Sequence, residues 1–126
     1  MTDGDSEDVA LRFIFDNIET VPQLEALLLM WQNRMRTWTA EELAARIYVG
    51  PTDAKNILDY LLRQVLVHEP APDNFQYSTE RDATNDLMRR VAETYARNLV
   101  GVTRMIHSKG SASVREFARA FQIKKD

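Results

Sequence analysis

The feature that most constrains the fold is a pair of amphipathic helix patterns that meet at the dipeptide Gly50-Pro51. Thr39 followed by Glu42 forms a capping box, in which each side chain satisfies a free backbone amide at a helix start. Apolar residues recur at helical spacing on both sides of the dipeptide: Leu43, Ala44 and Ile47 before it, and Ala54, Ile57, Leu58, Leu61, Leu62 and Val65 after it. Two short helices joined by a tight turn bury such stripes against a third helix.

Gly50 and Pro51 are the residues that we expect to separate these two helices. Glycine tolerates a positive φ at a helix end, and proline cannot continue the amide ladder. We therefore expect the first helix to start near Ala40 and the second near Asp53, with Thr52 as its cap.

A hairpin pattern follows the second helix. The segment 65–69 is typical of a strand, the segment 70–74 of a loop, and the segment 75–78 of a returning strand. We expect the two strands to pair near Val67 and Gln76. A third, short strand is expected to begin at Trp38, ahead of the first helix.

In this order of elements, the stretch from Thr39 to Tyr77 resembles a winged helix-turn-helix, a DNA-reading module of small bacterial regulators. The resemblance covers residues 20–80 and rests on pattern and order, so a helical domain with an unrelated hairpin is the alternative. It implies a mainly α, α+β winged-helix fold, with a three-helix core and a small β-hairpin wing. It also implies that the second helix of the pair is the recognition helix.

The segment ahead of this core is expected to hold two helices. Residues 1–7 are small and acidic, and we expect them to be disordered. The apolar spacing of residues 9–18 favours a helix, although the alternation within residues 9–15 would also suit a strand. Thr20 and Gln23 form a second capping box, which begins the scaffold helix of the winged-helix domain, assigned to residues 8–80.

The remaining segment, residues 81–126, is expected to hold a long helix over about 83–108 and a short final helix that Ser113 and Glu116 would cap. The long helix carries an apolar seam close to the repeat of a packed helix pair. Its members are Met88, Val91, Tyr95, Leu99, Val102 and Ile106. We expect this seam to form a homodimer, although the N-terminal helix or the final helix is an alternative cover for it.

The net charge of −3 is unevenly distributed along the chain. Residues 1–36 and residues 37–80 each carry −4, whereas residues 81–126 carry +5. Such asymmetry indicates either an interaction surface or an internal pairing between the two ends. The composition is that of a globular protein. Because no apolar run is long enough to span a membrane and the N-terminus has no signal pattern, we expect a cytoplasmic protein.

The sequence lacks the common catalytic and metal-binding motifs. The chain has no cysteine, which excludes disulfides, thiolate catalysis and cysteine-based zinc sites. His68 and His107 are too isolated to predict a metal site, which needs three or four ligands. No phosphate-binding glycine loop or hydrolase motif is present. We therefore expect neither an enzyme nor a bound cofactor.

Aromatic and arginine side chains offer weaker signals. Tyr48, Phe75 and Tyr77 have the chemistry to stack on bases, but we expect them to pack at the base of the wing. Three arginines recur every seven residues in the long helix, and we expect a solvated face on which Glu93 pairs with two of them. These arginines are Arg90, Arg97 and Arg104.

Two functions are compatible with these patterns. The first is a homodimeric transcriptional regulator that binds double-stranded DNA. For it, the resemblance implies contacts from Thr52, Lys55, Asn56, Tyr60 and Arg63. The second is a protein–protein interaction module without DNA binding, which the charge favours because the wing has no Lys or Arg to neutralise phosphate. A third option moves DNA binding to the basic C-terminal segment.

Overall fold

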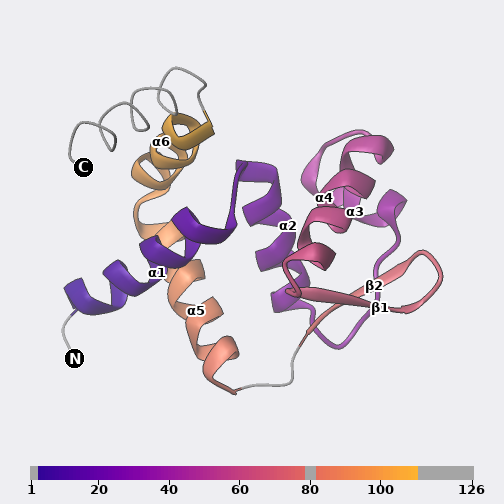
Figure 1. Ribbon diagram of the computed structural model, residues 1–126, viewed down its shortest axis with the longest axis horizontal. Helices are drawn as coiled ribbons and strands as arrows, with labels where there is room; N and C mark the ends of the chain where they lie inside the picture. The colour runs from indigo at the N-terminus through magenta and orange to yellow at the C-terminus, as the bar shows by residue number, and fades with distance from the viewer. Residues whose placement is uncertain (1–2, 79–81, 111–126) are drawn as a thin grey trace, which may run out of the picture.

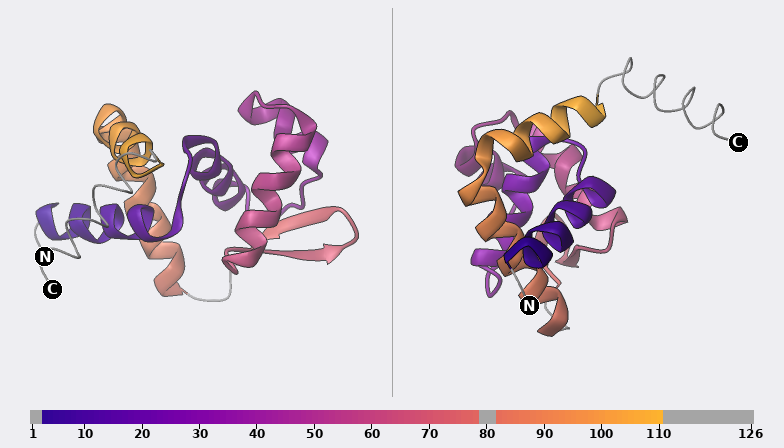
Figure 2. Two further views of the ribbon diagram at one scale, coloured as in Figure 1. Left: turned by 45° about the horizontal axis from the view of Figure 1, so that its top comes forward. Right: turned by 90° about the vertical axis from the view of Figure 1, so that its left-hand side faces the viewer.

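The structure is a computed structural model that describes residues 3–78 and 82–110, and its helices form two groups around a central helix (Figure 1). The elements are α1 (Asp3–Asn17), α2 (Val21–Gln32), α3 (Ala40–Ile47), α4 (Pro51–Arg63), β1 (Val67–Ala71), β2 (Asn74–Tyr77), α5 (Asp82–Arg97) and α6 (Leu99–Gly110). Figures 1 and 2 show α1, α5 and α6 at one end, α3, α4 and the hairpin at the other, and α2 between them. This is the expected winged helix, with flanking helices.

Capping boxes begin α2 and α3, as predicted. The Thr39 hydroxyl accepts from the Glu42 amide at 3.1 Å, and the Glu42 carboxylate accepts from the Thr39 amide at 2.9 Å. Thr20 and Gln23 form the same reciprocal pair at the start of α2. The amide of Thr39, and then the guanidinium of Arg36 at 3.0 Å, lower the pKa of Glu42. These caps fix where the scaffold helix and the first helix of the motif begin.

The turn between α3 and α4 differs from the prediction. Tyr48, the C-cap of α3, takes the left-handed conformation (φ 61°, ψ 46°) that we expected of Gly50. Gly50 is extended instead and is the N-cap of α4, which begins at Pro51. Proline suits this position because its missing amide would have no helical partner there. Thr52 therefore lies inside α4 rather than capping it.

The wing is present in the predicted place. β1 and β2 are antiparallel, with Val67 opposite Tyr77 and His68 opposite Gln76. Trp38 forms an isolated antiparallel bridge with Phe75, with backbone hydrogen bonds of 2.7 and 2.8 Å, which is the short third strand that was expected. The bridge anchors the hairpin to the segment that leads into α3.

Aromatic residues at the base of the wing fill the core of the motif. Phe75 and Tyr77 are each only 1% exposed, as expected for packing residues. Trp38 is buried beside them in the same core. Tyr48 was expected to pack with them, but it is 92% exposed. The left-handed backbone at Tyr48 turns its side chain outward at the end of α3.

The predicted long C-terminal helix is interrupted at Asn98. The Asn98 side chain accepts from the Gly101 amide at 3.1 Å, and the Asn98 carbonyl accepts from the Val102 amide at 3.0 Å. This is the hydrogen-bond pattern of a helix N-cap, so a new helix, α6, starts directly after it. The heptad spacing of the seam runs through this break, which is why periodicity did not reveal it.

Most of the apolar seam is covered within the chain itself. Met88, Val91, Val102 and Ile106 are buried in the core of the chain itself, in one cluster with residues of α1. α1 packs against α5 and α6 and covers the seam, which is the intrachain alternative. Tyr95 is half-buried and donates to Glu25 on α2 at 3.0 Å. Of the six seam residues, Leu99 remains largely exposed.

α1 is a helix rather than a strand, and it begins at Asp3. Residues 3–7, which we expected to be disordered, are therefore helical. An acidic segment at a helix N-terminus is favoured by the positive end of the helix dipole. The predicted final helix and its capping box at Ser113 lie outside the described residues.

Candidate nucleic-acid interface

A groove of about 380 Å³ lies where the N-termini of α3 and α4 meet the hairpin. It is lined by Thr39, Ala40, Glu41, Pro51, Thr52, Lys55, Asn56, Asp73 and Phe75. Three of the five predicted contact residues therefore line one groove. Ala40 and Glu41 of α3 and Asp73 of the wing were not among the predicted contacts, and Phe75 was expected to pack at the base of the wing. No sequence signal pointed to these residues, because their place beside α4 depends on how α3 and the hairpin pack against that helix.

Arg63 and Tyr60, the other two predicted contacts, do not line the groove. Arg63 is exposed at the C-terminal end of α4, and its guanidinium lies 6.0 Å from the centre of the Tyr60 ring. The Tyr60 hydroxyl donates to the backbone carbonyl of Asn17 at 2.6 Å. Burial, and then the carboxylate of Glu19, raise the pKa of Tyr60. Because its hydroxyl is engaged within the chain, we leave Tyr60 out of the interface.

Lys55 is the cation of the groove, and it is surrounded by acids. Its ammonium lies 3.0 Å from Asp59 and 5.7 Å from the centre of the Phe75 ring. The hydrogen bond to Asp59 and the charge of that carboxylate raise the pKa of Lys55, with smaller contributions from Asp73 and Glu69. The cation is thus partly neutralised before any ligand arrives.

The tip of the wing adds negative charge to the groove. The Glu69 carboxylate accepts from the Asp73 amide at 2.8 Å, and Asp73 is in the left-handed conformation at φ 62°. Residues 67–77 include no Lys or Arg. His68 is exposed on β1. The wing therefore presents a hydrogen-bonded acidic turn, where phosphate binding would need cations.

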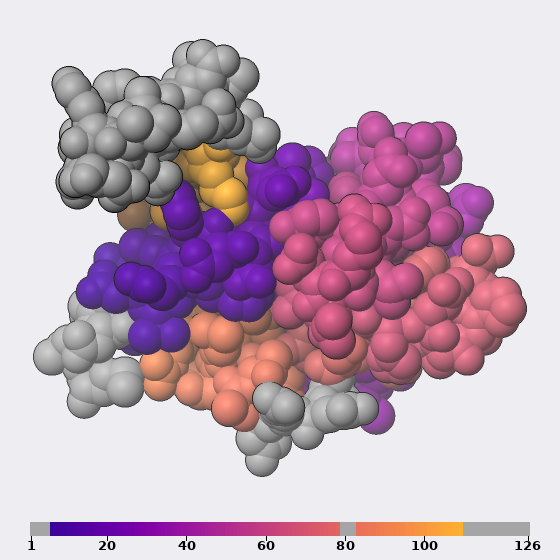
Figure 3. Space-filling model, viewed as in Figure 1, coloured from indigo at the N-terminus to yellow at the C-terminus, as the bar shows by residue number. Residues whose placement is uncertain are grey.

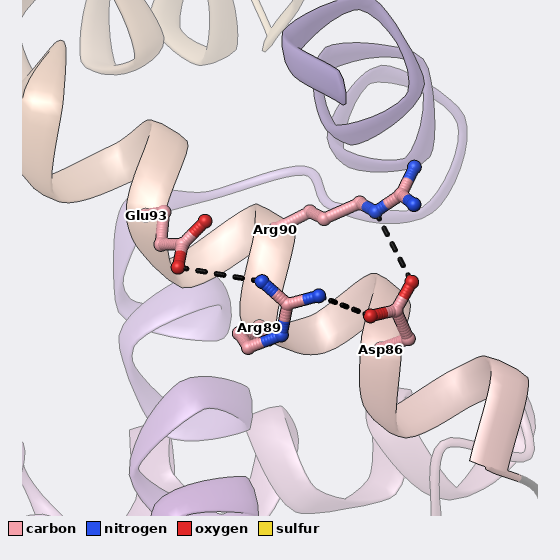
Figure 4. A network of polar contacts seen from close by, with 4 residues as sticks. All are labelled: Asp86, Arg89, Arg90 and Glu93. Carbon is pink, nitrogen blue, oxygen red and sulfur yellow. Dashed lines mark hydrogen bonds and ion pairs between the residues drawn. The ribbon is translucent and has the colours of Figure 1, made fainter. Parts of the chain in front are cut away.

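On α5, Arg89 and Arg90 form ion pairs with the carboxylates of Asp86 and Glu93 (Figure 4). Arg89 contacts both Asp86 and Glu93, and Arg90 lies 3.1 Å from Asp86. The predicted partner of Arg90 was Glu93, which instead lies 3.5 Å from Arg89. The break at Asn98 also places Arg104 on a different helix from Arg90, so the three arginines do not share one helix face.

In residues 3–78 and 82–110, no group of three His, Cys, Asp or Glu side chains is placed to hold a metal ion. None of the helices described there has the length and apolar character to cross a membrane.

Comparison with known proteins gives one similar fold. No protein-family model matches the sequence, and no curated protein is similar enough to match it. The crystal structure of MepR, a transcription regulator of the Staphylococcus aureus multidrug efflux pump MepA, has a TM-score of 0.50 and 16% sequence identity. The match covers 97% of this chain and 88% of that chain. At this identity the likeness shows a shared fold, which includes the flanking helices.

Proposed function

We propose that this chain is a DNA-binding transcription regulator of the winged helix-turn-helix type. The observation that carries the proposal is the groove in which Thr52, Lys55 and Asn56 face outward from the start of α4, beside the wing. In this fold the second helix of the motif enters the major groove and the wing approaches the adjacent backbone. A fold alone does not determine function. The likeness to a transcription regulator is a likeness of fold, so it supports the proposal only at that level.

Four exposed side chains of α4 have roles in this proposal. The Asn56 amide both donates and accepts, so it can pair with the edge of an adenine. Lys55 and Arg63 carry charge and would contact phosphates. The Thr52 hydroxyl can bond to a base or a phosphate, because it both donates and accepts. Base contacts would set sequence preference, whereas phosphate contacts would set affinity and its dependence on salt.

We further propose that the active form is a homodimer, formed through α6 rather than through the buried seam. Leu99 and Val100 are 51% and 65% exposed. They line a groove of about 420 Å³ together with Thr103, Arg104, His107 and Ser108. A second copy of α6 would cover these apolar side chains, in the isologous contact of a two-fold dimer.

The dimer is tested by sedimentation or light scattering of Leu99→Asp. We expect dissociation, because a charge would be buried without a partner. Met35→Asp is the matched control, since Met35 is exposed in the turn that follows α2 and its replacement adds the same charge. A parent protein that is monomeric at high micromolar concentration contradicts the dimer.

DNA binding is tested by fluorescence anisotropy with a labelled random-sequence duplex at low and moderate salt. We expect binding that weakens as salt rises. Lys55→Ala and Arg63→Ala should each weaken it and flatten the log–log salt dependence by about one unit, because each removes one phosphate contact. A parent protein without affinity at low salt overturns the proposal.

A second candidate function is favoured by the charge of the same groove. Glu41 and Asp73 line it, and Lys55 is already paired with Asp59. A groove lined by carboxylates, with its lysine already paired, is more complementary to a basic segment of another protein than to phosphate. If the duplex does not bind at low salt, this protein-interaction function takes first place.

A further inference from the structure

The C-terminal end of α1 is capped by side chains from two distant helices. The last four carbonyls of a helix have no partner within it. At α1, the Phe13 carbonyl accepts from the Asn17 side chain at 3.0 Å and the Ile14 carbonyl accepts from the Ile18 amide at 2.9 Å. Later carbonyls of the same turn accept from Tyr60 on α4 and Lys109 on α6.

Lys109 and Tyr60 both bind this one turn of backbone. The Lys109 ammonium donates to the carbonyls of Phe15 and Ile18, the latter at 2.6 Å. It also lies 5.2 Å from the centre of the Phe15 ring. A cation at the negative end of a helix dipole makes strong, charge-assisted hydrogen bonds. The Asn17 carbonyl, between these two acceptors in sequence, accepts from the Tyr60 hydroxyl at 2.6 Å.

These contacts join the two groups of helices. α4 packs on α2, α3 and β1, whereas α6 packs on α1 and α5. Figure 3 shows the surface of α1 lying against that of α4 on the visible face. The last turn of α1 is thus held from the recognition helix on one side and from the C-terminal helix on the other.

We propose that Tyr60 and Lys109 are positioning residues, which set the orientation of the recognition helix relative to α6 through the last turn of α1. The effect of this orientation on DNA binding rests on the proposed function. In a dimer formed through α6, this orientation fixes the distance between the two recognition helices. That distance must match one turn of duplex, about 34 Å, for both helices to enter the major groove.

The absence of cysteine from the chain allows a direct distance measurement. Spin labels are placed on Asn56→Cys in α4 and Arg104→Cys in α6, both at exposed positions. The distance is read within one chain, so it is valid whether or not the label at Arg104 breaks the proposed contact between two copies of α6. Excess unlabelled protein is added, so that double electron–electron resonance reports only the distance between the two spin labels of one chain. The parent is expected to give a narrow distribution of distances.

Tyr60→Phe and Lys109→Met each remove one link while keeping most of the side chain. Each should broaden or shift the distribution. The double variant should resemble either single variant, because two links in series are released when one is broken. Lys109→Arg, which keeps the charge and the donors, should restore the narrow distribution. Tyr95→Phe is the matched control, since it removes another interhelical tyrosine bond, from α5 to α2, and should change nothing.

DNA affinity gives a second readout. Tyr60→Phe should weaken binding of the random-sequence duplex about fivefold, the effect of one hydrogen bond, without flattening the salt dependence. If the parent does not bind the duplex, the proposed function fails, and the distance distributions still decide the positioning role. Distributions that are unchanged in both Tyr60→Phe and Lys109→Met overturn the inference.

Discussion

The ammonium of Lys55 lies 3.0 Å from the carboxylate of Asp59, one helical turn further along the exposed face of α4. The two side chains are 45% and 39% exposed. Exposed pairs at this spacing contribute little to stability, so a phosphate can displace the carboxylate. In the proposed DNA interface, the pair would therefore lower the affinity for DNA and still leave Lys55 free to contact a phosphate.

Removing the carboxylate should release the cation. We expect Asp59→Asn to tighten duplex binding a few-fold at low salt, because Lys55 would be unpaired and one repulsion of phosphate would be lost. The measurement is an anisotropy titration against the parent. Asp8→Asn makes the same change of net charge on an exposed part of α1, away from the last turn of that helix, and it should have a much smaller effect. Equal gains in the two variants would mean that only net charge matters.

Asn56 should control sequence preference rather than affinity for DNA in general. An amide pairs with base edges and neutralises no phosphate. For Asn56→Ala, we expect the ratio of affinities for a selected duplex and a scrambled one to fall, with an unchanged salt dependence. A flattened salt dependence in this variant would contradict the role assigned to the amide.

Replacing the residue by glycine at two left-handed positions should stabilise the folded protein. Val65 has a φ of 60° and Tyr48 a φ of 61°, where the Cβ atom is crowded by the backbone. Both side chains are exposed and lose little packing when removed. We expect Val65→Gly and Tyr48→Gly each to raise the free energy of unfolding by about 1 kcal/mol. Urea denaturation measures this change.

The control for these variants is a glycine where the backbone is helical. Ala45 lies within α3 and is exposed. Ala45→Gly should lower the free energy of unfolding by about 1 kcal/mol, because glycine is a poor helix former. If all three variants destabilise the protein alike, strain at the left-handed positions is not the cause.

Stability should fall steeply at alkaline pH. Burial raises the pKa of Tyr77 to about 12, and burial with the hydrogen bond to Glu25 raises the pKa of Tyr95 to about 12. Because both folded-state values lie above the unfolded value of 10.0, the folded protein binds these protons more tightly. The contribution is complete below pH 10 and is lost as pH rises towards 12.

Urea titrations across this range measure the effect. Tyr95→Phe should reduce the slope of stability against pH above pH 10, since one titrating group is gone. Parallel curves for the parent and the variant would show that Tyr95 does not titrate differently in the two states.

The winged helix could be predicted because its signals are local. The hydrogen bonds of the capping boxes at Thr20 and Thr39 join residues within one helical turn. The hairpin pattern likewise depends on residues that are neighbours in the sequence. The turn at Tyr48 was missed because glycine is the usual left-handed residue, and Gly50 lay two positions away. Local rules assign the left-handed conformation to glycine, the residue that most often adopts it, whereas in this chain Tyr48 adopts it.

The partners of buried faces could not be predicted from the sequence. Helical spacing shows that Met88 and Val102 lie on a buried face, but it does not show that the cover is α1 rather than a second chain. Tyr60 falls on the polar face of α4 by the same spacing, and only the fold brings Asn17 to its hydroxyl. The charge of the groove likewise depends on the wing, whose carboxylates approach Lys55 only after folding.

The most direct test of the DNA interface is amide chemical-shift mapping of the ¹⁵N-labelled protein during titration with a duplex. The interface predicts perturbations that centre on Thr52, Lys55 and Asn56 at the start of α4, with a second group at Asp73 on the wing. Perturbations confined to other surfaces, or none at low salt, would contradict it.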